Sequence, residues 1–360
     1  MGLSQIGRVV ALAIGMVSAQ AALAAPTPGP LEIYRDWAIG CDNIGSCTAT
    51  SLLPEKADIT DKTMAVLLSR DAGPAAAPHI ALLLPGDHQG PVDLLVDGVR
   101  FAGAQAQGDR IEIDAAHVTD LVKGMVRGLR LIASAQGRPL GTASLAGASA
   151  ALRYMDARQG RAGTVTGLVA TGKLSAGAVK AAARAPVIYH LPVPRGAAQP
   201  SSLWREERGK AIALSGCADE QRPTQEARIT PLSDKEELVL IPCGAGAYNF
   251  SSVPLIATGQ AGRRQFALAK FDLKPGWGEA DAPPMLVNAS WDAASATLTS
   301  HAKGRGLGDC GSSESYVWDG SVFRLTEMRA MNQCRGAREW LRLWHAQSMV
   351  MPTKKQKKQK

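Results

Sequence analysis

Six cysteines constrain the fold of this chain more than any other feature, because they fall into three local pairs behind an apolar N-terminal run. The pairs are Cys41 with Cys47, Cys217 with Cys243, and Cys310 with Cys334. Cysteines that follow an export signal form disulfides in an oxidising compartment. We therefore expect a fold whose loops are tied together by disulfides.

The spacing of the cysteines argues against metal binding and redox chemistry. A structural zinc site needs closely spaced cysteines with further Cys or His ligands nearby, and a redox-active pair usually has C-x-x-C spacing, which is absent from this sequence. Pairing between neighbours is favoured, because a proline-rich stretch separates Cys41 and Cys47 from the other four cysteines. Among those four, other pairings remain open.

The first 24 residues have the pattern of a secretory signal peptide. Arg8 precedes an apolar run over residues 9–24, and Ala22-Leu23-Ala24 supplies the small-x-small motif of a cleavage site, so the mature chain is expected to begin at Ala25. No later stretch has the roughly 18 consecutive apolar residues of a membrane helix. We predict a periplasmic or secreted protein without a transmembrane segment after cleavage.

The remaining chain is longer than a single hydrophobic core usually serves, which predicts two domains. Four prolines between residues 185 and 200 predict an extended linker, because proline fixes φ and removes a backbone donor. The expected order is a signal peptide over 1–24, an α+β domain over 25–184, a proline-rich linker over 185–200, a mostly β domain over 201–350 and a basic disordered tail over 351–360.

The first domain is predicted to be α+β, with two amphipathic helices. Period-two alternation from Ile33 to Cys41, followed by turn-prone residues, predicts a hairpin. Apolar residues from Val118 to Ile132 recur at helical spacing behind Asp114, a plausible N-cap, and a second helix is predicted over 145–155. Further strands are predicted over 64–69, 79–84, 92–96, 99–101 and 111–113.

The second domain is predicted to be mostly antiparallel β. Turn residues separate most of its strand candidates, and an Asp319-Gly320 turn joins two arms that carry large apolar residues. The strands are expected over 238–241, 265–271, 285–291, 316–318, 322–325 and 340–344.

Several short motifs resemble a known family. They are Asp36-Trp37, Cys41-Asp42-Asn43, Cys47, Phe323 and the segments 150–156, 303–311, 316–320, 334–336 and 340–344. Together they are similar to the uncharacterised proteobacterial exported-protein family catalogued as domain of unknown function 1176. The first domain also resembles the invasion-associated locus B proteins of host-associated bacteria. The first resemblance covers nearly the whole mature chain and implies export, but no known activity.

The charge distribution argues against nucleic-acid binding. The formal net charge is +8, but six positive charges belong to Arg8 and to the five lysines of residues 354–360, so the predicted folded part is close to neutral. A nucleic-acid site needs a basic face with interleaved aromatic residues. The tail is expected to be solvated and disordered. A weak attraction to anionic lipid headgroups or polysaccharide is its alternative role.

Motifs for catalysis, metals and cofactors are weak. Ser300 and Lys303 have Ser-x-x-Lys spacing, but they lie in a predicted strand and loop, where one helical turn would not bring them together. The glycines of 304–308 lack the strand and helix that flank a phosphate loop. The six histidines show neither H-x-H nor H-x-x-x-H spacing. We predict no cofactor and no metal, and non-enzymatic function is favoured over an enzyme.

One group of residues is a candidate recognition surface, because arginine forks and exposed aromatic rings are frequent in binding sites. Its members are Lys303, Arg305, Asp309, Tyr316, Trp318 and Arg335. The alternative is a structural hairpin whose glycines form turns and whose Trp fills a core. The leading hypothesis is an exported binding or envelope-associated protein, with an envelope component or another protein as partner. The alternatives are a periplasmic hydrolase with a dispersed site and a secreted enzyme inhibitor.

Overall fold

The structure is a computed structural model of the 360-residue chain, and it describes residues 25–60, 62–194, 202–217, 225–276 and 281–352. The predicted signal peptide, the last part of the predicted linker and the tail from residue 353 lie outside the described residues. The described chain is mostly antiparallel β-structure with three α-helices and three disulfides. The predicted domain boundary at 185–200 stays a prediction.

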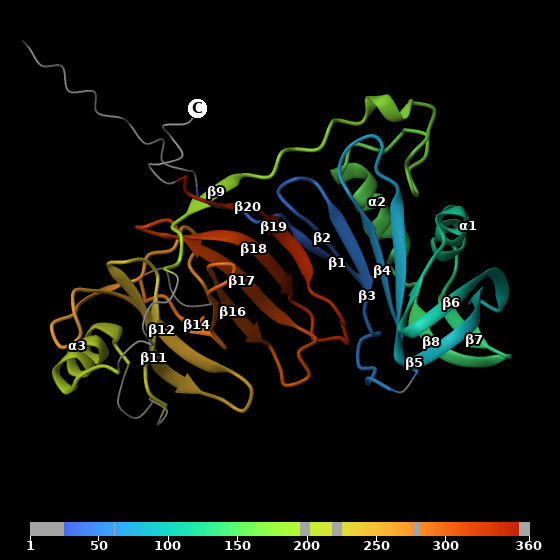
Figure 1. The fold of residues 1–360 in the computed structure, drawn as a ribbon. Coiled ribbons are helices and arrows are strands. Elements are labelled where there is room, and N and C mark those ends of the chain that lie inside the picture. Colours follow the sequence, from blue (N-terminus) through green and yellow to red (C-terminus); the bar gives the residue numbers. More distant parts are fainter. Residues whose placement is uncertain (1–24, 61, 195–201, 218–224, 277–280, 353–360) are drawn as a thin grey trace, which may run out of the picture.

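The N-terminal half is built on an eight-stranded antiparallel sheet in the order β1-β2-β3-β4-β5-β7-β8, with β6 also paired to β5. Its strands are β1 (Leu31–Tyr34), β2 (Trp37–Cys41), β3 (Cys47–Ser51), β4 (Ala65–Arg70), β5 (Pro78–Val96), β6 (Val99–Glu112), β7 (Arg130–Ala135) and β8 (Arg138–Ser144). Helices α1 (Ala115–Met125) and α2 (Ala148–Arg158) cover one face. The other face turns toward the C-terminal half (Figure 1).

Helix α1 is shorter than the predicted helical pattern, which runs to Ile132. Asp114 caps its start by accepting a hydrogen bond from the Ala116 amide, and Val118, Leu121, Val122 and Met125 are buried. The helix ends where Asp97 accepts hydrogen bonds from the amides of Leu129 and Arg130. Ile132 then continues into β7, because those two bonds hold the chain in a turn that begins a strand.

Glycines 124 and 128 allow α1 to pack closely on the β5–β6 hairpin. A Cβ atom at Gly124 would lie 2.7 Å from the Phe101 ring, and one at Gly128 would lie 2.2 Å from the Val96 side chain. The GxxxG spacing therefore serves packing within this fold. Helix α2 begins three residues later than predicted, after Gly147, whose φ of +102° and 1.7 Å approach of an added Cβ to the Tyr34 carbonyl oxygen both require glycine.

The C-terminal half contains two five-stranded sheets. One has the order β10-β11-β12-β13 with β14 paired to β12, and the other has the order β15-β16-β17-β18-β19. The strands of the first are β10 (Arg228–Pro231), β11 (Glu236–Ala245), β12 (Phe250–Thr258), β13 (Gln265–Leu268) and β14 (Leu286–Val287). Those of the second are β15 (Ser290–Asp292), β16 (Thr297–Lys303), β17 (Gly311–Trp318), β18 (Phe323–Met331) and β19 (Leu341–His345).

The two sheets pack face to face around one core, to which Leu238, Leu240, Leu298, Tyr316 and Phe323 contribute. Helix α3 (Arg205–Ser215), which the strand pattern did not predict, covers the outer face of the first sheet over a second core. This helix is ordered by a buried ion pair between Glu207 and Arg264, with Oε2 and Nη1 3.1 Å apart.

Two short strands form a separate small sheet at the predicted linker and pack against the C-terminal half. After α2 the chain passes a 3₁₀ turn (Ala176–Ala178) and reaches β9 (Val187–His190), as Figure 1 shows. Strand β20 (Gln347–Val350) pairs with β9 in parallel, so part of the predicted linker is β-structure and this pair departs from the antiparallel pattern. A strand that returns from the far end of a chain can pair in either direction, because no hairpin fixes its sense.

Candidate functional site

The glycine-rich loop between β16 and β17 is held by a disulfide at its end. The structure contains the three neighbour disulfides Cys41–Cys47, Cys217–Cys243 and Cys310–Cys334. The third ties the start of β17 to the segment that follows β18. A Cβ atom at Gly304 would lie 2.6 Å from the Cys310 sulfur, so the loop backbone passes directly over the disulfide.

Asp309 organises the inside of this loop. Its carboxylate is buried and accepts hydrogen bonds from Arg305 Nε at 2.7 Å, Arg305 Nη2 at 2.6 Å and the Gly336 amide at 2.6 Å. Burial acts to raise the pKa of Asp309, but the bonds from Arg305 and Gly336 outweigh it and hold that pKa below its ordinary value. Asp309 is therefore an ionised structural anchor of the loop.

Arg335, which follows Cys334 of the same disulfide, binds the N-terminal half with its guanidinium. Its Nε donates to the Leu53 carbonyl oxygen at 2.7 Å, its Nη1 donates to the Arg35 carbonyl oxygen at 2.8 Å, and its Nη2 forms an ion pair with Asp36. The side chain is only 14% exposed. The three acceptors are all in the N-terminal half, so Arg335 does not lie with Lys303 and Arg305.

Tyr316 and Trp318 also depart from the predicted surface, because both rings are buried between the two C-terminal sheets. Alternate residues of β17 face this core, and positions 316 and 318 fall on that face. The indole Nε1 of Trp318 donates to Glu236 Oε2 at 3.0 Å. Trp318 therefore fills the core, which is the structural alternative given for this hairpin in the sequence analysis.

Lys303 and Arg305 lie in the same loop as the exposed Leu307, and the end of the β11–β12 hairpin contacts this loop through the Tyr248 hydroxyl, which donates to the Gly304 carbonyl oxygen at 3.4 Å. The exposed fractions are 38% for Tyr248, 44% for Phe250 and 68% for Leu307. The Asn249 side chain binds the Lys303 backbone twice: its Nδ2 donates to the carbonyl oxygen at 2.8 Å, and its Oδ1 accepts from the amide at 3.1 Å. We call the set of Tyr248, Phe250, Lys303, Arg305 and Leu307 the loop surface.

Sequence reasoning missed Tyr248 and Phe250. The signal was present, since both aromatics follow a glycine-rich stretch (244–246) at a turn between two apolar runs, and large rings at turns are exposed more often than rings within strands. Their neighbourhood to residue 303 could not be read from the sequence, because it depends on how the two sheets are stacked.

The loop rests on a pair of stacked rings. The imidazole of His301 and the indole of Trp340 lie 4.4 Å apart between centroids with an interplanar angle of 7°. Trp340 Nε1 donates to the Gly308 carbonyl oxygen at 3.1 Å. Burial lowers the pKa of His301, and the nearby Lys303 charge lowers it further. A neutral imidazole therefore supports the loop from beneath.

Ser300 and Lys303 are separated by the pleat of β16. Ser300 is buried opposite Glu314 and accepts a hydrogen bond from the Val287 amide at 3.1 Å, whereas residue 303 points to the other face of the strand. Their Ser-x-x-Lys spacing thus places them apart, as expected for a strand. Within the described residues, no three His, Cys, Asp or Glu side chains gather as a metal site would require.

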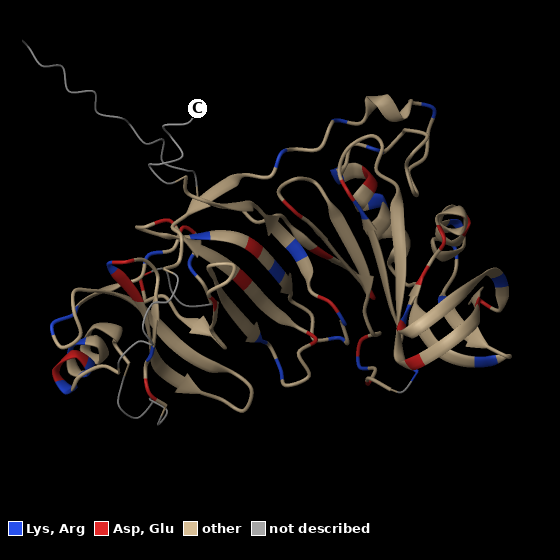
Figure 2. Ribbon diagram, viewed as in Figure 1, with Lys and Arg blue, Asp and Glu red and all other residues tan. Residues whose placement is uncertain are grey.

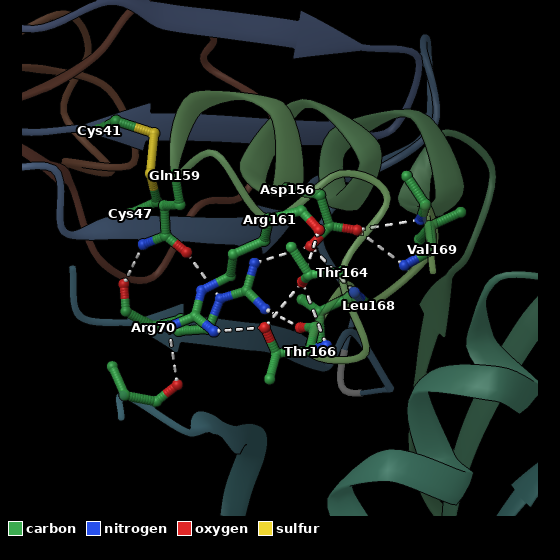
Figure 3. Close-up of polar contacts among 12 residues, drawn as sticks. Cys41, Cys47, Arg70, Asp156, Gln159, Arg161, Thr164, Thr166, Leu168 and Val169 are labelled. Atoms are coloured by element: carbon green, nitrogen blue, oxygen red, sulfur yellow. Dashed lines mark hydrogen bonds and ion pairs between the residues drawn. A yellow bond between two sulfur atoms is a disulfide. The ribbon is translucent and has the colours of Figure 1, made fainter. Parts of the chain in front are cut away.

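A buried polar network lies under α2 in the N-terminal half (Figure 3). Arg70 forms an ion pair with Asp156 at 2.7 Å, and its Nε donates to Gln159 Oε1 at 2.6 Å. Gln159 in turn donates to the Gly45 carbonyl oxygen inside the Cys41–Cys47 loop. Asp156 also accepts bonds from the amides of residues 168–170. These saturated contacts order the segment after α2 and are structural.

Charges of both signs are interspersed over the ribbon, and they alternate along β18 (Figure 2).

Among the described residues, no helix is long and apolar enough to cross a membrane.

Comparisons with known proteins bear out the family resemblance. A model for the family described as "Protein of unknown function (DUF1176)" matches residues 31–347. The uncharacterized protein YpfG of Escherichia coli (strain K12) is 29% identical over 333 residues, which is 86% of this chain and 91% of that protein. The crystal structure of invasion associated protein b from Bartonella henselae covers 36% of this chain and 99% of its own, with 21% identity and a TM-score of 0.27.

Proposed function

Because this chain belongs to the DUF1176 family of proteins of unknown function, we propose its role from its own structure: it is an exported binding protein that recognises an acidic partner through the loop surface. The observation that carries this proposal is the contact between a hairpin end that carries two exposed aromatic rings and a disulfide-held loop that carries an exposed leucine and two cations.

The disulfides support export. Stable disulfides are rare in reducing compartments and common in exported proteins, and all six cysteines of this chain are bonded. Processing after Ala24 is part of the proposal and concerns residues outside those described. The intact mass of the protein recovered from the periplasm tests it. A mass that retains residues 1–24 would refute the cleavage site.

The rigidity of the loop supports binding. A side chain held in place before association loses less conformational entropy when it meets a partner. Here the Asp309 carboxylate, the Trp340 indole and the Cys310–Cys334 disulfide all fix the backbone that carries Arg305 and Leu307. Tyrosine and arginine are also enriched among the residues that dominate binding energy.

The charges of the loop surface favour an acidic partner. Within the described chain, no carboxylate pairs with the Lys303 ammonium, and Arg305 is 40% exposed although it binds Asp309. Such cations at the rim of an apolar patch steer an anionic partner and fix its orientation. The exposed Leu307 at the tip of a stapled loop also favours a second candidate, an enzyme inhibitor that inserts this residue.

Capture from envelope extract, followed by mass spectrometry, tests the binding role. We expect a partner that is retained by the wild type and lost by Leu307→Ser and by Lys303→Glu. Leu129→Ser is the matched control, because Leu129 is equally exposed at 71% but lies in the N-terminal half. Retention of every captured partner by both loop variants would refute the loop surface as the binding site.

A further inference from the structure

A polar cavity of about 220 Å³ lies between the two halves of the protein. Strands β3 and β4 form one wall, and β18, β19 and the segment before β19 form the other. The lining includes Leu67, Asp71, Arg329, Trp340 and Arg342. The cavity is distinct from the loop surface and shares no residue with it.

Two arginines stand side by side on the C-terminal wall. Arg329 and Arg342 are register partners across β18 and β19, so their side chains leave neighbouring backbone positions. Like charges directly opposite each other in a sheet destabilise it. One carboxylate neutralises each positive charge. Arg329 Nε donates to Glu327 at 2.8 Å, and Arg342 Nε donates to Asp42 at 3.0 Å.

The outer nitrogens of this arginine pair remain available. Within the described chain, neither the Nη atoms of Arg329 nor those of Arg342 have a hydrogen-bond partner. A guanidinium presents its donors as a planar fork that matches the two oxygens of a carboxylate. Two such forks at one edge of a cavity therefore form a receptor for a carboxylate group.

The N-terminal wall carries the opposite charge. Asp71 accepts a hydrogen bond from Ser46 Oγ at 3.1 Å and, among the described residues, forms no ion pair. The other acidic residue of the lining, Glu339, belongs to the C-terminal wall and is paired with Arg110 at 3.3 Å. Ser69 and Thr48 add hydroxyl groups to the N-terminal wall. One wall of the cavity can thus bind a carboxylate and the other an ammonium group.

We propose that this cavity binds a small zwitterion, a free amino acid or a dipeptide, with its carboxylate on Arg329 and Arg342 and its ammonium group on Asp71. The volume supports this size, because pockets for drug-sized ligands begin at about 300 Å³. Leu67 and Trp340 provide apolar surface for a side chain.

The cavity is held open by contacts between the halves on its flanks. Arg335 pairs with Asp36, and Asn43 exchanges two hydrogen bonds with the His345 backbone, at 3.0 Å and 2.7 Å. A site fixed in this way needs no closure to form, so binding is expected without a large conformational change.

Isothermal titration calorimetry with L-alanyl-L-alanine tests the proposal. N-acetyl-L-alanyl-L-alanine lacks the ammonium group, and L-alanyl-L-alanine amide lacks the carboxylate. We expect the zwitterion to bind at least tenfold more tightly than either blocked peptide. Equal binding of the N-acetyl peptide would overturn the role of Asp71, and the absence of heat with L-alanine and the dipeptide at about 20 mM would overturn the site.

Variants locate the binding in the cavity. Arg329→Gln and Asp71→Asn should each weaken L-alanyl-L-alanine binding at least tenfold, with unfolding temperatures near that of the wild type. Arg100→Gln is the matched control, since Arg100 is an exposed arginine paired with Asp93 on β5 and β6, far from the cavity. If Arg329→Gln binds as the wild type does, the carboxylate is held elsewhere and the proposal fails.

Discussion

Arg335 and Asp36 form an ion pair that joins residues 299 positions apart and links the C-terminal half to the start of the N-terminal sheet. The two carbonyl oxygens that Arg335 also binds belong to the same N-terminal segments. The two halves are therefore connected by a saturated polar contact as well as by the apolar cluster around Ala38 and Leu341.

Replacement of this arginine is expected to destabilise the fold. Arg335→Ala removes the donor to two carbonyl oxygens and the counter-ion of Asp36, which keeps its hydrogen bond from Ser144 Oγ, and this should cost about 2–4 kcal/mol of unfolding free energy. Urea denaturation measures the loss. Arg100→Ala, at an exposed ion pair, should change stability by less than about 1 kcal/mol. If Arg335→Ala is as stable as the control, the Arg335 contacts do not hold the two halves together.

The sequence was informative where contacts are local. The proline-rich stretch separates Cys41 and Cys47 from the other cysteines, so their pairing could be predicted, whereas the pairing of the other four stayed open. Asp114 and the apolar residues behind it located α1. The contacts of Arg335 could not be read from the sequence, because its partners lie about 300 positions away. Tyr316 and Trp318 were ambiguous because a large ring suits both a core and a binding surface, and only the pleat of β17 decides between them.

Long-range arrangement also explains what no local pattern could reveal. The polar cavity between the halves takes residues from β3, β4, β18 and β19, which come together only when the halves pack. Part of that packing depends on Gly40, where an added Cβ would lie 2.8 Å from the Leu343 side chain and 2.9 Å from that of Leu341. The sequence around a single glycine in a strand does not indicate which element packs against it.

The buried carboxyl of Glu314 predicts a pH-dependent stability. Burial raises its pKa, against hydrogen bonds with Ser312 and Ser300, and within the described chain its Oε2 has no partner. A raised folded-state pKa means that the folded protein holds this proton more tightly than the unfolded chain, where the pKa of Glu is about 4.3. The contribution is therefore most favourable below that value and is lost as the pH rises through the folded-state pKa.

Glu314→Gln isolates this contribution, because the amide keeps the size of the side chain and cannot ionise. The stability difference between variant and wild type should grow in favour of the variant as the pH rises from about 4 to 8. Urea denaturation at several pH values measures it, and the comparison cancels Asp309 and Asp319, whose lowered pKa values act in the opposite direction. A difference that does not vary with pH would show that Glu314 titrates normally.

The burial of Trp318 predicts a large loss on truncation. Trp318→Ala should cost about 3–5 kcal/mol, because the ring fills the core between the sheets. Trp318→Phe keeps most of the ring and loses the hydrogen bond to Glu236, so a smaller loss of about 1–2 kcal/mol is expected. Thermal unfolding ranks the two. Leu307→Ala, at an exposed position, should leave stability near the wild-type value.

The Arg70–Asp156 pair predicts a strong asymmetry between single and double replacements. Both side chains are almost fully buried, at 1% and 0% exposed. Asp156→Asn leaves the Arg70 charge without its counter-ion and should cost about 3–5 kcal/mol, whereas Arg70→Met combined with Asp156→Asn removes both charges and should recover part of that loss. A double-mutant cycle from urea denaturation measures the coupling. Additive losses would mean that the two residues contribute independently, and the network under α2 would then owe its order to the bonds from the amides of residues 168–170 rather than to the ion pair.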